Sequence, residues 1–406
     1  MDDSGPPNAT GNKERKPWMT RVVLLLPIVA LCAWGGYRTW FNHRLEAARS
    51  QCVSADDQED WQSVVKWGEI WTRLAPEDAE AWLLLADGYS KQGDFQRTAE
   101  CLGRIPRDDE RFLSARAMRG DLLLSELHLA SEAEQNWREM LEVAPNATLA
   151  HQRLIYLYSI TLQRGKMARQ IRDAIAQKCE PREAYFYLMA RSALNFSDGI
   201  LRVGEWLKKD PENEVLIAAN AVYRAKAPKG SALRLFGVEE TAGGDLSTVD
   251  LALKQVPGNP ELLAYHLEGL MIEGSVSEVA DTLSKWTDTD NSPRYWRYRG
   301  WLLDAQGQLH EAIECYNRSL ELDPFDWRSR HELAGLQRIA GQSAESTDNA
   351  QIAALGKSVQ QRFFELPNAK LADQQLMLDL LEFMEGCGDP DISNALALRM
   401  SHFATN

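Results

Sequence analysis

GWLLDAQGQLHEAIECYNRSLELDP, residues 300–324, decides the fold of this chain. Its apolar residues recur at helical spacing on both sides of Gln306-Gly307, which predicts two amphipathic helices with a short turn between them. Glycine suits this turn because a helix often ends on a residue in the left-handed conformation. A lone pair of helices this short cannot bury much apolar surface, so the pattern predicts that similar pairs stack against it.

A second stretch of the chain has the same pattern of large and small residues. The stretch that starts at Ala79 aligns with the one that starts at Pro293. Small residues at matched positions allow two helices to approach closely, and the aromatic residues fill the space between helices. We therefore predict that the chain repeats one helical unit. The matched positions are Trp82 with Trp296, Ala86 with Gly300, and Gly93 with Gly307.

This unit resembles the tetratricopeptide repeat, a helix–turn–helix of about 34 residues with the pattern W-x2-L-G-x2-Y, then A-x3-F, then P. Arg299 and Leu303 depart from the Leu and the Tyr of that pattern. The resemblance implies an all-α fold, a right-handed superhelical solenoid of helix pairs, in which the first helix of each pair lines a concave groove. It also implies binding of proteins or peptides. The residues that carry the resemblance are Trp296, Arg299, Gly300, Leu303, Ala312, Tyr316 and Pro324.

The repeats predict the organisation of the chain. Its parts are a polar, disordered tail over 1–17, a transmembrane signal anchor over 18–41, degenerate helical repeats over 45–292, the best-matching repeat pair over 293–360, and C-terminal helices that cap the solenoid over 361–406.

Residues 18–41 read WMTRVVLLLPIVALCAWGGYRTWF and predict a single membrane span. The uncharged run from Val22 to Tyr37 is shorter than the ~20 residues that a span needs. Arg21 and Arg38 can extend it because their charged ends reach toward the headgroups. Aromatic residues near its ends favour the same interfacial region. The basic residues before the run outnumber those after it by one. This bias favours an N-terminus in the cytoplasm and repeats on the extracytoplasmic, periplasmic side.

A cleaved signal peptide is the alternative for this segment. Basic residues precede an apolar stretch, and Ala33 and Gly35 would form a small-x-small cleavage site. The bulky Trp34 between them, and the pair Trp40-Phe41 that follows, favour the uncleaved anchor. Cleavage would leave an exported soluble protein.

The rest of the sequence contains no arrangement that predicts catalysis, a cofactor or a metal. The seven histidines include no HExxH pair, the six cysteines do not cluster, and neither GxGxxG nor a P-loop occurs. The 406 residues carry a net charge of −14, and an acidic chain repels nucleic acid. We therefore expect no enzyme and no nucleic-acid partner.

One helical face predicts a binding site. Arg294, Arg297 and Trp301 recur at helical spacing on the first helix of the best repeat, and the equivalent face of the next repeat is also basic. Gly335 lies one repeat after Trp301 and leaves room beside it. This groove would suit an acidic peptide or a chain-terminal carboxylate; a solvated charged face is the alternative. The candidate residues are Arg294, Arg297, Trp301, Arg328, His331 and Arg338.

These observations favour a membrane-anchored scaffold or adaptor that binds a partner protein and assists envelope assembly or secretion. The alternatives are a structural repeat protein that associates with itself, and the exported soluble form.

Overall fold

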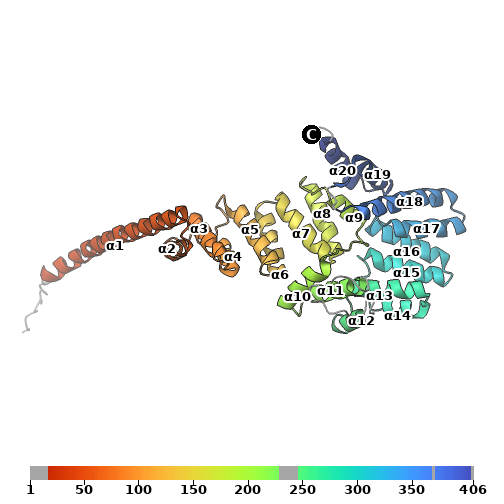
Figure 1. Ribbon diagram of the computed structural model, residues 1–406, viewed down its shortest axis with the longest axis horizontal. Coiled ribbons are helices and arrows are strands. Elements are labelled where there is room, and N and C mark those ends of the chain that lie inside the picture. The colour runs from red at the N-terminus through yellow and green to blue at the C-terminus, as the bar shows by residue number, and fades with distance from the viewer. Residues whose placement is uncertain (1–16, 228–245, 368–370, 404–406) are drawn as a thin grey trace, which may run out of the picture. The chain divides into compact units, whose positions relative to one another are not determined.

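The computed structural model of the chain describes residues 17–227, 246–367 and 371–403, with side chains over 34–227, 248–367 and 371–400. Within these ranges the chain forms twenty α-helices and no strand (Figure 1). The prediction of an all-α repeat fold is therefore confirmed. The helices belong to two compact units, Met1–Ala115 (unit 1) and Arg116–Asn406 (unit 2). Their boundary lies inside the predicted segment 45–292.

Unit 1 contains a long helix followed by three short ones. Aspartates begin the short helices: Asp60, Asp78 and Asp94 each accept a hydrogen bond from a backbone N–H of the first turn, which satisfies donors that the helix itself leaves unpaired. The helices are α1 Pro17–Asp57, α2 Trp61–Leu74, α3 Ala79–Lys91 and α4 Phe95–Leu102.

The core of unit 1 lies between the C-terminal half of α1 and the next two helices. Ala48 and Cys52 of α1 are buried against Val64 and Trp71 of α2. The indole Nε1 of Trp71 donates a hydrogen bond to the Asp78 carboxylate at 3.0 Å, so the largest buried side chain is also paired with the cap of α3.

The predicted span over 18–41 lies within α1. In the part of the chain that the structure describes, no helix has the length and apolar character that a membrane crossing requires. The side chains of residues 17–33, which make up most of the predicted span, lie outside the described residues.

Unit 2 is a series of helices, most of which contact the next helix in the sequence (Figure 1). It begins within α5, Phe112–Ser125. The helices that follow are α6 Ala130–Val143, α7 Thr148–Ile160, α8 Arg164–Ala176, α9 Ala184–Met189, α10 Gly199–Lys209, α11 Glu214–Lys226, α12 Leu246–Gln255, α13 Pro260–Glu273, α14 Val276–Leu283, α15 Pro293–Ala305, α16 Leu309–Leu322, α17 Trp327–Ile339, α18 Ser343–Glu365, α19 Gln374–Gly386 and α20 Pro390–Phe403.

Glycines permit the close approach of paired helices. A Cβ at Gly300 of α15 would lie 2.9 Å from the ring of Tyr316 in α16, and one at Gly120 would lie 2.2 Å from the indole nitrogen of Trp137. Gly307, between α15 and α16, has φ +74°, a left-handed conformation that residues with a Cβ rarely adopt. Both uses of glycine agree with the sequence pattern.

The last helices of unit 2 return to its middle. In Figure 1 the blue helices α18–α20 lie beside the yellow-green α8 and α9, and both α18 with α9 and α20 with α8 are in contact. The Arg399 side chain donates a hydrogen bond to the Glu180 carboxylate at 2.8 Å, and Arg172 pairs with Asp389 at 2.7 Å. Unit 2 is thus closed by contacts between segments that are distant in sequence.

Candidate partner-binding site

A cavity of about 360 Å³ opens beside the first helices of the best repeats, and three of the six predicted groove residues line it. We call it the α15–α17 cavity. Arg297 and Trp301 come from α15, and Arg328 comes from the start of α17. The other lining residues are Ser192, Ala193, Lys226, Glu268, Met271, Tyr298, Tyr316 and Glu332.

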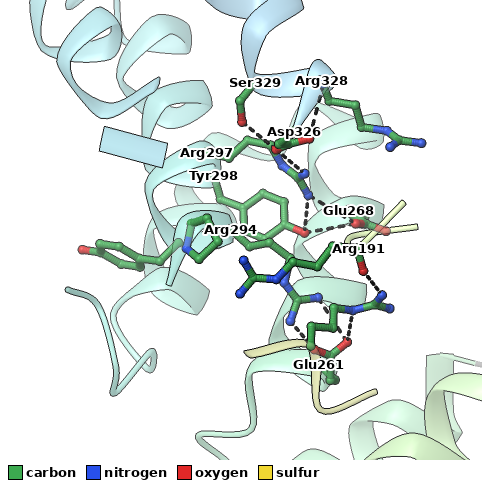
Figure 2. Close-up of polar contacts among 12 residues, drawn as sticks. Arg191, Glu261, Glu268, Arg294, Arg297, Tyr298, Asp326, Arg328 and Ser329 are labelled. Carbon is green, nitrogen blue, oxygen red and sulfur yellow. Dashed lines mark hydrogen bonds and ion pairs between the residues drawn. The ribbon is translucent and has the colours of Figure 1, made fainter. Parts of the chain in front are cut away.

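Arg297 is buried in the wall of this cavity and its charge is neutralised there. Its guanidinium pairs with Asp326 at 3.0 Å and donates a hydrogen bond to the Tyr298 hydroxyl at 3.1 Å (Figure 2). The Tyr298 hydroxyl donates in turn to Glu268 at 3.0 Å. Burial alone would raise the pKa of the Asp326 carboxyl, but Arg297 and the Ser329 hydroxyl outweigh it and lower the pKa below its usual value. Both groups therefore stay charged.

Arg294 is also paired internally, and it faces a neighbouring cavity of about 320 Å³. The Glu261 carboxylate of α13 accepts hydrogen bonds from Arg294, one of them at 3.1 Å, and from Arg164 of α8 at 3.0 Å (Figure 2). Burial opposes ionisation of Glu261, but the two guanidinium groups prevail and lower the pKa of its carboxyl.

The expectation of an open basic face therefore needs correction at Arg294 and Arg297. Their guanidinium groups point into the protein, where each forms an ion pair with a buried carboxylate. A buried cation is stable only with such a counter-charge. The sequence spacing is consistent with the Arg294–Glu261 pair, since Glu261 lies 33 residues before Arg294, which is about one repeat.

Arg328 differs from these two arginines. No described carboxylate lies within 4 Å of its guanidinium, which instead lies 4.5 Å from the centroid of the Trp327 ring. Figure 2 shows its side chain extending away from the Arg297–Asp326 pair. Burial lowers the pKa of Arg328, which means that its charge is incompletely solvated. A half-buried cation without an ion pair is the feature of this cavity that most favours an anionic ligand.

Trp301 supplies the apolar part of the same cavity. It is half-buried and packs against a core that includes Leu267, Leu270 and Tyr298. A Cβ at Gly335 would meet no atom within 4 Å, so the predicted space one repeat later is present. A ligand beside Arg328 could therefore contact the indole.

The other two predicted residues are not part of the cavity. His331 and Arg338 lie on α17 with exposed side chains, and neither lines the α15–α17 cavity. The helical spacing places them on the same helix as Arg328, but not against the same space.

Sequence reasoning missed a segment that borders both cavities. Arg191 and Ser192 follow α9, and Ser192 lines both spaces. Arg191 pairs with Asp323 at 3.6 Å, and Arg164 donates a hydrogen bond to the backbone oxygen of Leu194 at 3.3 Å. No repeat pattern marks this segment, because its position depends on the closure of unit 2.

Among the described residues, no group of three or more His, Cys, Asp or Glu side chains is arranged to hold a metal ion. Ion pairs such as Arg297–Asp326 and Arg294–Glu261 lie in the walls of the two cavities, whereas Arg328 has no such partner in the described part of the chain.

The comparison with protein families matches residues 293–326 to the tetratricopeptide repeat. This segment of the chain therefore has the sequence of one tetratricopeptide repeat. The match falls on the predicted best repeat, from the first residue of α15 to the aspartate that begins α17. Repeats of this family generally mediate interactions between proteins.

Solved structures similar to this chain have low sequence identity to it. The APC/C hetero-tetramer Cut9–Hcn1 is 14% identical, with 88% of this chain and 72% of that chain covered and a TM-score of 0.31. A tetratricopeptide repeat protein from Parabacteroides merdae is 12% identical, with 64% and 98% covered and a TM-score of 0.29. No curated protein sequence matches the chain significantly.

Proposed function

We propose that this tetratricopeptide repeat protein is a membrane-anchored, non-enzymatic scaffold that binds an acidic segment of a partner protein in the α15–α17 cavity. The observation that carries the proposal is Arg328, a half-buried cation that lines the cavity without a carboxylate in ion-pair distance. A carboxylate of the partner would form a charge-assisted hydrogen bond with it, which is stronger than a neutral one. Trp301 would contact the apolar part of the same segment.

The acidic residues of the cavity limit how much negative charge it accepts. Glu268 and Glu332 also line it, while Arg297 is neutralised by Asp326. A partner that placed several carboxylates here would meet repulsion from the two glutamates. The cavity therefore suits one carboxylate beside Arg328 with apolar atoms next to it, as a chain terminus or a single Asp or Glu would supply.

The membrane anchor rests on the sequence of residues 18–41 and on the residues at its end. Trp34, Tyr37 and Trp40 are all more than half exposed on α1. Arg38 lies over the Trp34 ring and Arg44 over the Trp40 ring, at 5.2 Å and 5.3 Å from the centroids. Exposed aromatic and basic side chains together are typical of the headgroup region. The repeats would then lie on the extracytoplasmic side, where the scaffold assists envelope assembly or secretion.

Site-specific crosslinking tests the proposal. A photoreactive amino acid at Trp301 in the full-length membrane protein should capture a partner that the same group at His331 does not capture. Crosslinks only to a second copy of this chain would favour the self-associating alternative. An N-terminus mapped to about Gly36 would favour the exported soluble form.

The captured partner is then titrated against three proteins. Arg328→Gln should weaken binding about tenfold, because a buried charge-assisted hydrogen bond is lost. Arg338→Gln removes the same charge from the exposed part of α17 and should leave the affinity within about twofold of wild type. Equal effects of the two substitutions would contradict the assignment of this cavity.

A further inference from the structure

A third cavity, of about 450 Å³, lies where unit 2 closes on itself. Aromatic side chains form much of its wall: Tyr187 comes from α9, Phe196 from the segment after it, and Phe363 and Phe364 from the end of α18. We call it the aromatic cavity. Phe364 is 48% exposed although it is large and apolar.

Contacts within the wall hold these rings in place. Phe196 meets Tyr187 edge to face, with 6.2 Å between the ring centroids, and it meets Tyr156 in the same way at 6.3 Å. On the other side, Phe363 stacks on Phe186 of α9. The cavity is therefore built from packed rings and does not depend on a single exposed side chain.

Among the described residues, the charged side chains that line the aromatic cavity are both acidic. Glu183 and Asp198 line it, and no Lys, Arg or His from the described part of the chain does. Asp198 pairs with Arg202, whereas the Glu183 carboxylate accepts a hydrogen bond from a neutral amide, the Nε2 of Gln152, at 3.3 Å. Burial, with the nearby Glu183, raises the pKa of Tyr187 to about 12, so this phenol is neutral at neutral pH.

We propose that the aromatic cavity binds an arginine side chain of a partner protein. A guanidinium is attracted to the faces of aromatic rings, and its planar shape allows it to stack on them. Glu183 would accept its hydrogen bonds and would supply the counter-charge. A neutral apolar ligand would partly desolvate the Glu183 carboxylate without supplying a counter-charge, which disfavours such a ligand.

This site is independent of the proposed function, because it takes a ligand of opposite charge to the one proposed for the α15–α17 cavity. The two cavities share no lining residue. A partner could use one or both, and each can be tested alone.

The test uses the full-length chain in detergent and a peptide probe, acetyl-Gly-Gly-Arg-Gly-Gly-amide. A second probe has citrulline in place of arginine, which keeps the shape and removes the charge. Saturation-transfer NMR titrations should show binding of the arginine peptide and binding at least about tenfold weaker for the citrulline peptide. A lysine peptide that bound equally well would contradict the selectivity for a planar guanidinium.

Matched variants locate the binding. Glu183→Gln should weaken binding of the arginine peptide at least about fivefold, and Phe364→Ala should weaken it because a ring is removed from the wall. Asp348→Asn removes an equal charge from an exposed position on α18 and should change nothing. Arg328→Gln should also leave this binding unchanged, whatever it does at the α15–α17 cavity.

Equal binding of the arginine and citrulline peptides would overturn the proposal. Unchanged affinity in both Glu183→Gln and Phe364→Ala would overturn it as well. Circular dichroism of each variant confirms that the helical content is retained, and Phe364→Ala keeps the test decisive if Glu183→Gln disturbs the start of α9.

Discussion

Phe186 of α9 and Phe363 of α18 stack face to face, with 4.7 Å between their ring centroids and 6° between their planes. Both side chains are buried. An open helical solenoid is stabilised mainly by contacts between neighbouring repeats. Here a long-range aromatic contact, together with the Arg399–Glu180 and Arg172–Asp389 pairs, closes unit 2. This closure creates the aromatic cavity.

The stacked pair should contribute measurably to the stability of unit 2. Phe363→Ala removes a buried ring and should lower the free energy of unfolding by about 3–5 kcal/mol. Phe364→Ala is the control, because its side chain is half exposed and should cost about 1 kcal/mol or less. Urea denaturation followed by circular dichroism measures both. Similar losses for the two variants would show that the closure is not a tight contact.

Glu261 pairs with two buried arginines, so its charge should contribute more to the free energy of unfolding than the charge of Glu268 does. Glu261→Gln leaves Arg164 and Arg294 without a counter-charge and should lower the free energy of unfolding by about 3–5 kcal/mol. The Glu268 side chain is 47% exposed, so Glu268→Gln should cost about 1 kcal/mol or less. Chemical denaturation compares the two, and a larger loss for Glu268→Gln would contradict this account.

The carboxyl of Asp323 should titrate near neutral pH. Burial raises its pKa to about 6, and Arg191 offsets only part of that effect. Carbon-13 NMR of labelled aspartate should show this pKa, and Arg191→Met should raise it further.

The same pKa has a consequence for stability. An unfolded aspartate has a pKa of about 3.9, so between pH 4 and 6 the folded state binds the proton more strongly than the unfolded state. The free energy of unfolding of wild type should therefore increase relative to Asp323→Asn as pH falls from 7 to about 4. A difference that is constant with pH would rule out the raised pKa.

Gly300 of α15 and Gly335 of α17 should respond in opposite directions to alanine. Gly300→Ala places a Cβ 2.9 Å from the Tyr316 ring and should destabilise unit 2, because both helices are tightly packed there. Gly335→Ala meets no atom within 4 Å and should increase the free energy of unfolding by about 0.5–1 kcal/mol, since alanine is the better helix former. Thermal unfolding distinguishes them by the sign of the shift in Tm.

Deletion of residues 1–41 tests the anchor. The full-length protein should stay in the membrane fraction after an alkaline carbonate wash, and the deletion should release it. The part of α1 that packs in unit 1, which includes Ala48 and Cys52, is retained, so the released protein should keep its helical circular dichroism spectrum. Release of the full-length protein by carbonate would contradict anchoring.

The sequence by itself determined the repeat and its local geometry. Gly307 ends a helix because glycine adopts its φ of +74° without strain. Gly300 indicates close packing of two helices because it aligns with a small residue, Ala86, in another repeat. This packing lies within one helix pair and does not depend on what surrounds the repeat. Such features depend on residues within one helix pair, and these are near one another in the sequence.

Tertiary structure alone decided which charges are free. Arg294, Arg297 and Arg328 share a face at helical spacing, yet only Arg328 lacks a carboxylate within 4 Å among the described residues. Pairing depends on acidic groups from other helices, and Arg191 reaches Asp323 only because the segment after α9 lies against the repeats. Periodicity reports the direction of a side chain from its own helix, whereas burial and ion pairing depend on what the rest of the fold places opposite it.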